Sequence, residues 1–408
     1  MKAEYNQVWS RLGLPIVLLV ALGFCTPLAA QVCSTGGPVT LSSQAQVASF
    51  QADYGAPTCD TMSDDLTVSG ADITDLSPLG LTTMITPARF VIDGNTSLVT
   101  LDGLSLTSVY WLQVSNNPAV TSINGLSTVV SAGGPVIIRN NALLTNVNGL
   151  SGLSSLPGGA LQLADNTSLA DLGGVSGITS TGGSLVIQNN AALTNLNALT
   201  NLTGVNGLVI MDNAALASIS GLSSLTSTGA TGSVNIRNNP NLASLTGLSG
   251  LTSVGGLVIS NNDALTDLDP LIGITSVGNS TSLALLNNDS LVDITGLANV
   301  EGVGFQVEIS GNTSLSQCSI LARLLDQVDD FAPGPGPGVA GIPDVGDDVI
   351  IGGNLSGCNS VPEIVGAPPP PPPPGMQSVA VPALASWTRL ALVLMILGAG
   401  LIGFRREL

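Results

Sequence analysis

The segment Leu257-Val-Ile-Ser-Asn-Asn262 decides the fold, because variants of it recur along the chain. Close copies are Leu185-Val-Ile-Gln-Asn-Asn190, Leu208-Val-Ile-Met-Asp-Asn213 and Val234-Asn-Ile-Arg-Asn-Asn239. A leucine follows each copy, and a Gly-Leu pair often comes after it. Such self-similarity is the signature of a stacked solenoid, in which neighbouring units bury each other's apolar faces. The repeat therefore predicts one elongated body that acts through its surfaces.

One asparagine marks each unit, at spacings of 22 to 26 residues. The alternation Leu-x-Ile before it predicts a short strand whose larger residues point inward. Gly, Ser and Thr fill the rest of the unit and form helices poorly, so we expect an extended or irregular return path. We expect the stacked asparagines to satisfy buried backbone groups as a structural ladder. They are Asn95, Asn117, Asn141, Asn166, Asn190, Asn213, Asn239, Asn262, Asn288 and Asn312.

Composition removes several classes of function. The 408 residues include 27 acids and 9 bases, for a net charge of −18, which disfavours nucleic-acid binding. There is no histidine, and the only lysine is Lys2, so histidine-based catalysis, common zinc sites, Schiff-base lysines and P-loops are excluded. We expect no enzyme activity, no cofactor and no metal. Two acidic clusters match no calcium-loop motif and are interpreted as solvated charge: Asp263, Asp267 and Asp269, and Asp344, Asp347 and Asp348.

The first 30 residues have the features of a secretory signal. Lys2 and Arg11 give the basic start, residues 12–24 the apolar stretch, and Leu28-Ala-Ala30 a small-residue cleavage site. Four cysteines remain after cleavage, which in an exported chain suggests two disulfides. Of the three possible pairings we expect Cys33–Cys59 and Cys318–Cys358, because each pair then closes one end of the repeats.

The C-terminal end resembles the bacterial sorting tails named after an Ile-Pro-Thr-Leu-x-x-Trp motif, which exosortase-type proteases are thought to recognise. A run of seven prolines, Pro368–Pro374, precedes it as a stiff spacer. An apolar stretch, Leu390–Phe404, follows the motif and is interpreted as a transmembrane helix. The residues that carry the resemblance are Val381, Pro382, Leu384 and Trp387, with Ala383 in place of threonine, and the basic end Arg405 and Arg406. The alternative is a plain membrane anchor.

The repeat itself is similar to the leucine-rich, receptor L-domain-like repeats of bacterial surface proteins, over residues 60 to 360. The resemblance implies a mainly β, parallel β-solenoid with disulfide-closed caps, a short capping helix in Leu41–Phe50 and a last repeat strand before Asn354. It implies surface recognition without naming a ligand. The expected divisions are a signal peptide (1–30), an N-terminal cap (31–65), repeats (66–317), a C-terminal cap with a Pro/Gly insertion (318–362), a Pro-rich linker (363–380) and the sorting signal (381–408).

The strand residues between the inward Leu and Ile should face out and form a candidate binding face. Arg139 and Arg237 share one repeat position, where they either bind a carboxylate or are solvated surface charges. Tyr110 and Trp111 either stack on a sugar ring or fill an edge. The apolar residues of the face either mark an interaction site or reflect β-propensity. With the two arginines, the candidate face comprises Val91, Ile137, Val186, Val209 and Val258.

These features predict an exported binding or adhesion module that recognises a glycan, a matrix polymer or a protein. An exosortase-like enzyme is the expected processing partner, and the C-terminal helix anchors the chain in the inner membrane before processing. The expected location is the surface or exterior of a Gram-negative-type bacterium. The alternative is a purely structural component of the envelope or matrix with no specific ligand.

Overall fold

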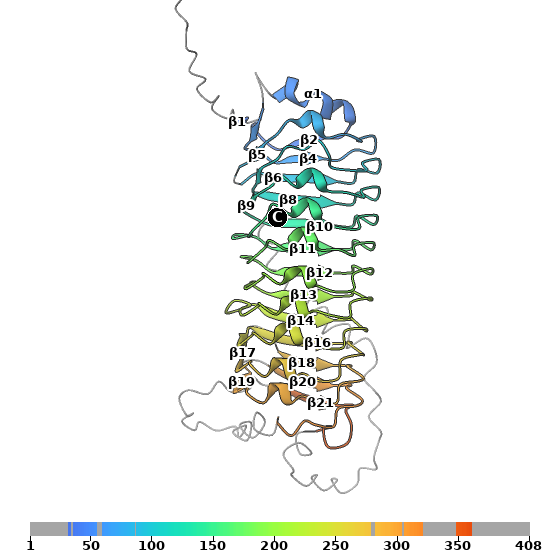
Figure 1. Ribbon diagram of the computed structural model, residues 1–408, viewed down its shortest axis with the longest axis vertical. Coiled ribbons are helices and arrows are strands. Elements are labelled where there is room, and N and C mark those ends of the chain that lie inside the picture. The colour runs from blue at the N-terminus through green and yellow to red at the C-terminus, as the bar shows by residue number, and fades with distance from the viewer. Residues whose placement is uncertain are drawn as a thin grey trace, which may run out of the picture. The chain divides into compact units, whose positions relative to one another are not determined.

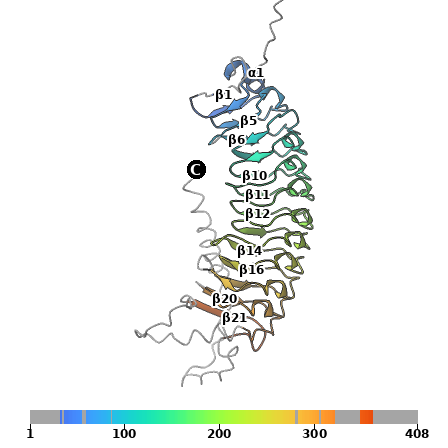
Figure 2. The same ribbon diagram turned by 60° about the vertical axis from the view of Figure 1, so that its left-hand side comes forward.

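The computed structural model describes residues 32–33, 36–54, 59–85, 87–278, 282–303, 306–320 and 348–360. All of them belong to one compact unit of the chain, residues 1–365. The expected signal peptide, proline run and sorting tail lie outside the described residues. Within them the chain is mainly β, and every strand pairing is parallel, as the repeat predicts. The strands stack in chain order, one coil after another (Figures 1 and 2).

One large sheet runs through the whole described stack. It contains 13 of the described strands, each paired with the corresponding strand of the next coil. In order they are β2 (Val39–Leu41), β4 (Leu66–Val68), β6 (Arg89–Asp93), β8 (Trp111–Ser115), β10 (Val136–Arg139), β11 (Leu161–Ala164), β12 (Leu185–Gln188), β13 (Leu208–Met211), β14 (Ser233–Arg237), β16 (Gly256–Ser260), β18 (Leu283–Leu286), β20 (Gln306–Ser310) and β21 (Asp348–Gly352).

The register of this sheet places equivalent residues of the repeat side by side. Leu185 pairs with Leu208, and Ile187 with Ile210. These side chains are buried and belong to one apolar core that extends from Cys33 to Cys358. Because no repeat can enclose this core alone, its stability depends on the neighbouring coils.

Shorter strands form two further parallel sheets. The first contains β1 (Val32–Cys33), β3 (Thr61–Met62), β5 (Thr83–Met84), β7 (Ser108–Val109) and β9 (Ser131–Ala132). The second contains β15 (Ser253–Val254), β17 (Ser276–Val277) and β19 (Gly302–Val303).

The return path differs in part from the expectation. It is mostly irregular, but single 3-10 turns form at several of the Gly-Leu pairs and at the equivalent positions of other coils, because three residues suffice for such a turn despite poor helix propensity. A polar side chain two residues before the turn often accepts a backbone N–H, as Asn195 does from Asn197 at 3.1 Å. The turns are η1 (Ser77–Leu79), η2 (Asn124–Leu126), η3 (Asn148–Leu150), η4 (Gly173–Val175), η5 (Asn197–Leu199), η6 (Ser220–Leu222), η7 (Thr246–Leu248), η8 (Asp269–Leu271) and η9 (Thr295–Leu297).

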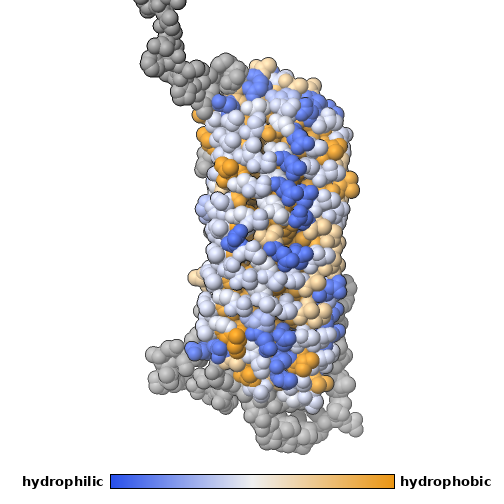
Figure 3. Space-filling view, in the orientation of Figure 1, coloured by the Kyte–Doolittle hydropathy of each residue, from blue (hydrophilic) through white to orange (hydrophobic). Residues whose placement is uncertain are grey.

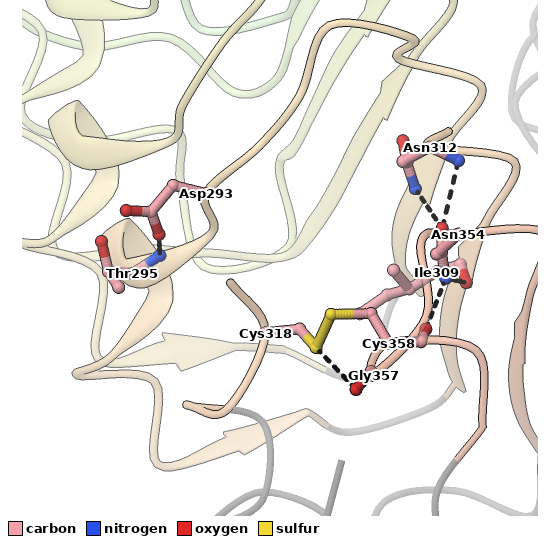
Figure 4. The surroundings of a disulfide bond; sticks show 8 residues. All are labelled: Asp293, Thr295, Ile309, Asn312, Cys318, Asn354, Gly357 and Cys358. Carbon is pink, nitrogen blue, oxygen red and sulfur yellow. Dashed lines mark hydrogen bonds between the residues drawn. A yellow bond between two sulfur atoms is a disulfide. The ribbon is translucent and has the colours of Figure 1, made fainter. Parts of the chain in front are cut away.

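Both ends of the stack carry a disulfide, paired as the sequence predicts. At the N-terminal end, helix α1 (Gln44–Tyr54) follows β2 and buries Val47 and Phe50. It overlaps the capping helix expected in Leu41–Phe50 and starts and ends a few residues later. Cys33–Cys59 closes this end. At the other end Cys318–Cys358 joins two segments that are 40 residues apart in sequence. Figure 4 shows this disulfide beside the last strand.

The repeat asparagines form a continuous buried ladder. Asn213 is typical: its Oδ1 accepts the backbone N–H of Asn190 at 3.1 Å, and its Nδ2 donates to the carbonyl of Ile187 at 3.0 Å. The ten asparagines predicted for the ladder are fully buried. Asn354, after the 42-residue gap, extends it: its Oδ1 accepts the N–H of Asn312 at 3.1 Å (Figure 4). The ladder therefore satisfies backbone groups of adjacent coils from the coil of β4 to the coil of β21.

A second row of residues stands immediately before the ladder. Each has a positive φ, a conformation that Asn, Asp and Gly adopt most easily. Several of their side chains bond to the previous coil, such as Asn238 Nδ2 to Asp212 Oδ1 at 2.6 Å. The row explains why the repeat carries Asn-Asn, Asp-Asn or Gly-Asn. Its members are Gly94, Asn116, Asn140, Asp165, Asn189, Asp212, Asn238, Asn261, Asn287, Gly311 and Gly353.

Candidate binding face on the large sheet

The outward side of the large sheet carries the residues of the candidate face in rows that cross the strands. In the middle row Asn235 lies between Val209 and Val258 on the neighbouring strands. The row exposes little apolar surface. Of the apolar residues predicted for this face, Val91, Val186 and Val209 are half-buried, and Ile137 and Val258 are 8% and 4% exposed.

The molecule shows no single broad apolar patch on the side drawn in Figure 3. Hydrophilic side chains form a broken line along the stack there, and apolar patches are scattered between paler regions. Exposed apolar side chains that stand singly are ordinary on protein surfaces. On the outer side of the large sheet, where the predicted apolar residues are half-buried or buried, polar groups that lack partners are the better guide to a binding site.

The two arginines of the face occupy the same row but different environments. The register connects Arg139 to Arg237 through Ala164, Gln188 and Met211. Arg139 is exposed, whereas Arg237 is only 8% exposed. Burial lowers the pKa of the Arg237 guanidinium, because desolvation disfavours its charged form. The interpretation as a solvated surface charge therefore fits Arg139 and is wrong for Arg237.

Strand β14 carries three shielded polar atoms without partners. They are Oδ1 of Asn235 and both Nε and Nη2 of Arg237, and none has a hydrogen-bond partner among the described residues. Asn235 and Arg237 are two residues apart on one strand and therefore point to the same side. Leaving such buried groups unpaired costs free energy. Asn235 Oδ1 lacks a hydrogen-bond donor, and the Arg237 guanidinium lacks an anion.

A second polar group lies towards the N-terminal end of the same face. Arg89 pairs with Asp65, with Nε 2.9 Å and Nη2 2.8 Å from Oδ2. Its guanidinium also lies over the Trp111 ring, 5.8 Å from the centroid, which is a cation–π distance. The indole Nε1 of Trp111 is shielded and has no hydrogen-bond partner within the described part of the chain. Tyr110 instead packs towards Gly133 of the next coil.

The acidic cluster Asp263, Asp267 and Asp269 does not converge on a site. Asp267 Oδ1 accepts the backbone N–H of Asp269 at 3.2 Å, as Asp293 does for Thr295 at 2.7 Å. Asp267 therefore shapes a turn of the repeat. Over the described ranges no group of three or more Asp, Glu, His or Cys residues could hold a metal ion. In the other cluster, Asp344 and Asp347 lie outside these ranges, and Asp348 is placed only by its backbone in β21.

Comparisons with known proteins leave the family open. No family model matches the chain, and no curated protein matches its sequence. The disulfides indicate an exported or extracellular protein, because disulfides persist in oxidising compartments. Within the described ranges, none of the helices has the length and apolar character that crossing a membrane requires.

Proposed function

We propose that this chain is an exported, surface-displayed binding or adhesion module that recognises a glycan, a matrix polymer or a protein. The observation that carries the proposal is the contrast between the two sides of the large sheet. On the inner side the asparagine ladder pairs the polar groups between coils. On the outer side Trp111, Asn235 and Arg237 keep shielded polar atoms without partners in the described structure. Binding sites hold polar groups ready for a ligand in this way.

The repeats are proposed to belong to the receptor L-domain-like, leucine-rich class. Parallel coils, a ladder of asparagines and disulfides at both ends support this assignment. Binding is proposed rather than catalysis, because the chain has no histidine and its cysteines at both ends are paired. Loops and faces of a rigid repeat scaffold are well suited to recognition, and such scaffolds bind along extended surfaces.

The C-terminal tail is proposed to be a sorting signal that an exosortase-like enzyme removes. The support is the sequence of Val381, Pro382, Leu384 and Trp387 ahead of an apolar stretch and a basic end. Mass spectrometry of the native protein tests this proposal. A mature C-terminus near Val381 is expected, and an intact Arg405–Arg406 end in the inner membrane would contradict it.

A structural role in the envelope or matrix is the second candidate. One observation favours it: a row of exposed threonines is already bonded within the stack. Thr203 Oγ1 donates to the carbonyl of Thr179 at 3.0 Å, and Thr226 Oγ1 to that of Thr203 at 3.2 Å. A surface that satisfies its own polar groups suits a regular, inert rod better than a specific receptor.

A binding screen on purified full-length chain separates the two functions. Immobilised glycans, matrix polymers and envelope proteins are the probes, and wild type is compared with Val209→Glu, which lies beside Asn235 in the register. The matched control is Val130→Glu, because Val130 is 60% exposed and lies outside the large sheet. Both variants add one negative charge. Binding that Val209→Glu weakens and Val130→Glu leaves intact is expected. Assembly into fibres or sheets without any ligand would favour the structural role.

A further inference from the structure

Arg237 presents one particular edge of its guanidinium without a partner. Nε and Nη2 are the adjacent atoms that direct two parallel N–H bonds at a carboxylate. The chain itself shows the occupied form of this edge, because Nε and Nη2 of Arg89 both contact the Asp65 carboxylate, at 2.9 and 2.8 Å. In Arg237 the same two atoms are shielded and have no hydrogen-bond partner in the described residues. The group that is missing at Arg237 is thus an oxyanion, and the Arg89–Asp65 pair shows a carboxylate in that place within this chain.

Asn235 adds a second requirement on the ligand. Its Oδ1 is a shielded acceptor that also lacks a partner within the described ranges, so the ligand must donate a hydrogen bond there. The Cα atoms of residues two apart on a strand are separated by about 6.6 Å, which sets the scale of the distance between the two side chains. A carboxylate and a hydroxyl on opposite sides of a pyranose ring have a separation of this order.

The surroundings of these two residues suit a sugar ring. Val209 and Val258 flank Asn235 on the neighbouring strands and offer apolar contact to the C–H groups of a ring. Met211 and Ser260 flank Arg237 in the next row. Met211 lies beside Arg237 in the register, half-buried and unbranched, so its side chain changes rotamer at little cost, and ligand access in this proposal relies on that movement.

We propose that Asn235 and Arg237 on β14 form a subsite for a uronate, the carboxylate-bearing sugar of acidic polysaccharides. The uronate carboxylate accepts two hydrogen bonds from Arg237, and a ring hydroxyl donates one to Asn235 Oδ1. This inference rests on the proposed binding function and adds the ligand class. The excess of acids over bases, 27 to 9, repels a long polyanion, so the subsite takes one uronate of a chain rather than many.

The test is calorimetric titration of the full-length chain with trigalacturonate, its methyl ester, neutral galactotriose and a hexaglutamate peptide. Trigalacturonate alone should bind. Arg237→Gln should weaken binding by about tenfold or more, since it removes a charge-assisted hydrogen-bond pair. Arg139→Gln, the exposed arginine of the same row, should bind as wild type does. Asn235→Val, which copies the residues on both neighbouring strands, should fold normally and bind more weakly.

Three results would overturn the subsite. The first is that trigalacturonate does not bind. The second is that Arg237→Gln and Asn235→Val both bind it with wild-type affinity. The third is that the methyl ester binds as tightly as the acid. Preference for hexaglutamate would replace the uronate by an acidic peptide and also refute it. If a ligand from the binding screen still binds Arg237→Gln with wild-type affinity, this subsite is wrong while the surface-binding function stands. If the wild type binds nothing in either experiment, both fail.

Discussion

Each ladder position is asparagine because its side chain combines one acceptor with two donors on a planar amide. Asn213 uses all of them: Oδ1 accepts from Asn190, and Nδ2 reaches the carbonyls of Ile187 and Met211 at 3.0 and 2.9 Å. Aspartate cannot donate and serine is too short to reach both neighbours. The choice of residue follows from the need to pair two coils at one buried point.

Replacement of a ladder residue should therefore destabilise the stack locally. Asn213→Ala leaves the Asn190 N–H and the Ile187 carbonyl without partners, at about 1–3 kcal/mol for each buried group. Asn201→Ala is the control: Asn201 is exposed, and its Nδ2 donates a hydrogen bond to the Ser176 carbonyl, so about 0.5 kcal/mol or less is expected. Chemical denaturation followed by circular dichroism measures both. Equal stability of the two variants would show that the ladder contributes little.

Among the elements, the 3-10 turns depend on close contact between successive coils. In η6 a Cβ added to Gly221 would lie 1.8 Å from the carbonyl oxygen of Leu196 in the previous coil. Gly247 in η7 meets Ile219 in the same way, at 1.9 Å. The Gly-Leu pairs of the repeat therefore reflect packing distance, since neither glycine has a positive φ. Ala198 fills the equivalent place in η5, so the spacing of individual coils varies.

Two glycine substitutions should consequently change stability in opposite directions. Gly221→Ala forces adjacent coils apart and should cost about 1–3 kcal/mol or more. Gly204→Ala is the control, because the nearest atom to its added Cβ is the Ser227 oxygen at 4.0 Å and its φ is not positive. It should be neutral or stabilise by about 0.4–1 kcal/mol, through lower entropy of the unfolded chain. Thermal melting of both variants decides the matter, and a Gly221→Ala variant as stable as wild type would refute the close-packing argument.

At the scale of the whole described stack, the two ends are the weak points, because a terminal coil has a neighbour on one side only. The disulfides lie at these ends. Cys318–Cys358 holds the segment after Asn312 to the segment after β21, where Asn354 Nδ2 also donates to the Cys358 carbonyl at 2.9 Å. The covalent bond and the last ladder residue therefore secure the same coil.

Loss of this bond should loosen the end of the stack before its middle. Cys318→Ser with Cys358→Ser is expected to lower stability by about 2–4 kcal/mol, a typical value for a native disulfide. Hydrogen exchange should accelerate in β20 and β21 and stay unchanged in β12 and β13, since repeats contact only their neighbours. Wild-type protein melted with and without reductant gives the same comparison. Coincident melting curves would show that the disulfides do not stabilise the fold.

The sequence predicted the architecture well because each repeat carries the same pattern of strand residues and asparagine. The Leu-x-Ile alternation indicated the strands, and the cysteines outside the repeats indicated two terminal disulfides, both present. The prediction failed where contacts between neighbouring coils decide the backbone conformation. The 3-10 turns were expected to be irregular, and the positive-φ row before each asparagine was overlooked, although the Asn-Asn and Gly-Asn pairs signalled it.

The sequence by itself determined the parallel stack, the buried ladder and the side of each strand that faces outward, because these follow from a period of two within a strand and one asparagine per coil. Only the tertiary structure separated Arg139 from Arg237. Both arginines occupy the same position of the repeat, but one is exposed and the other is buried with an unpaired guanidinium edge. Burial depends on what surrounds a side chain in space, and the residues around these two arginines come from different coils.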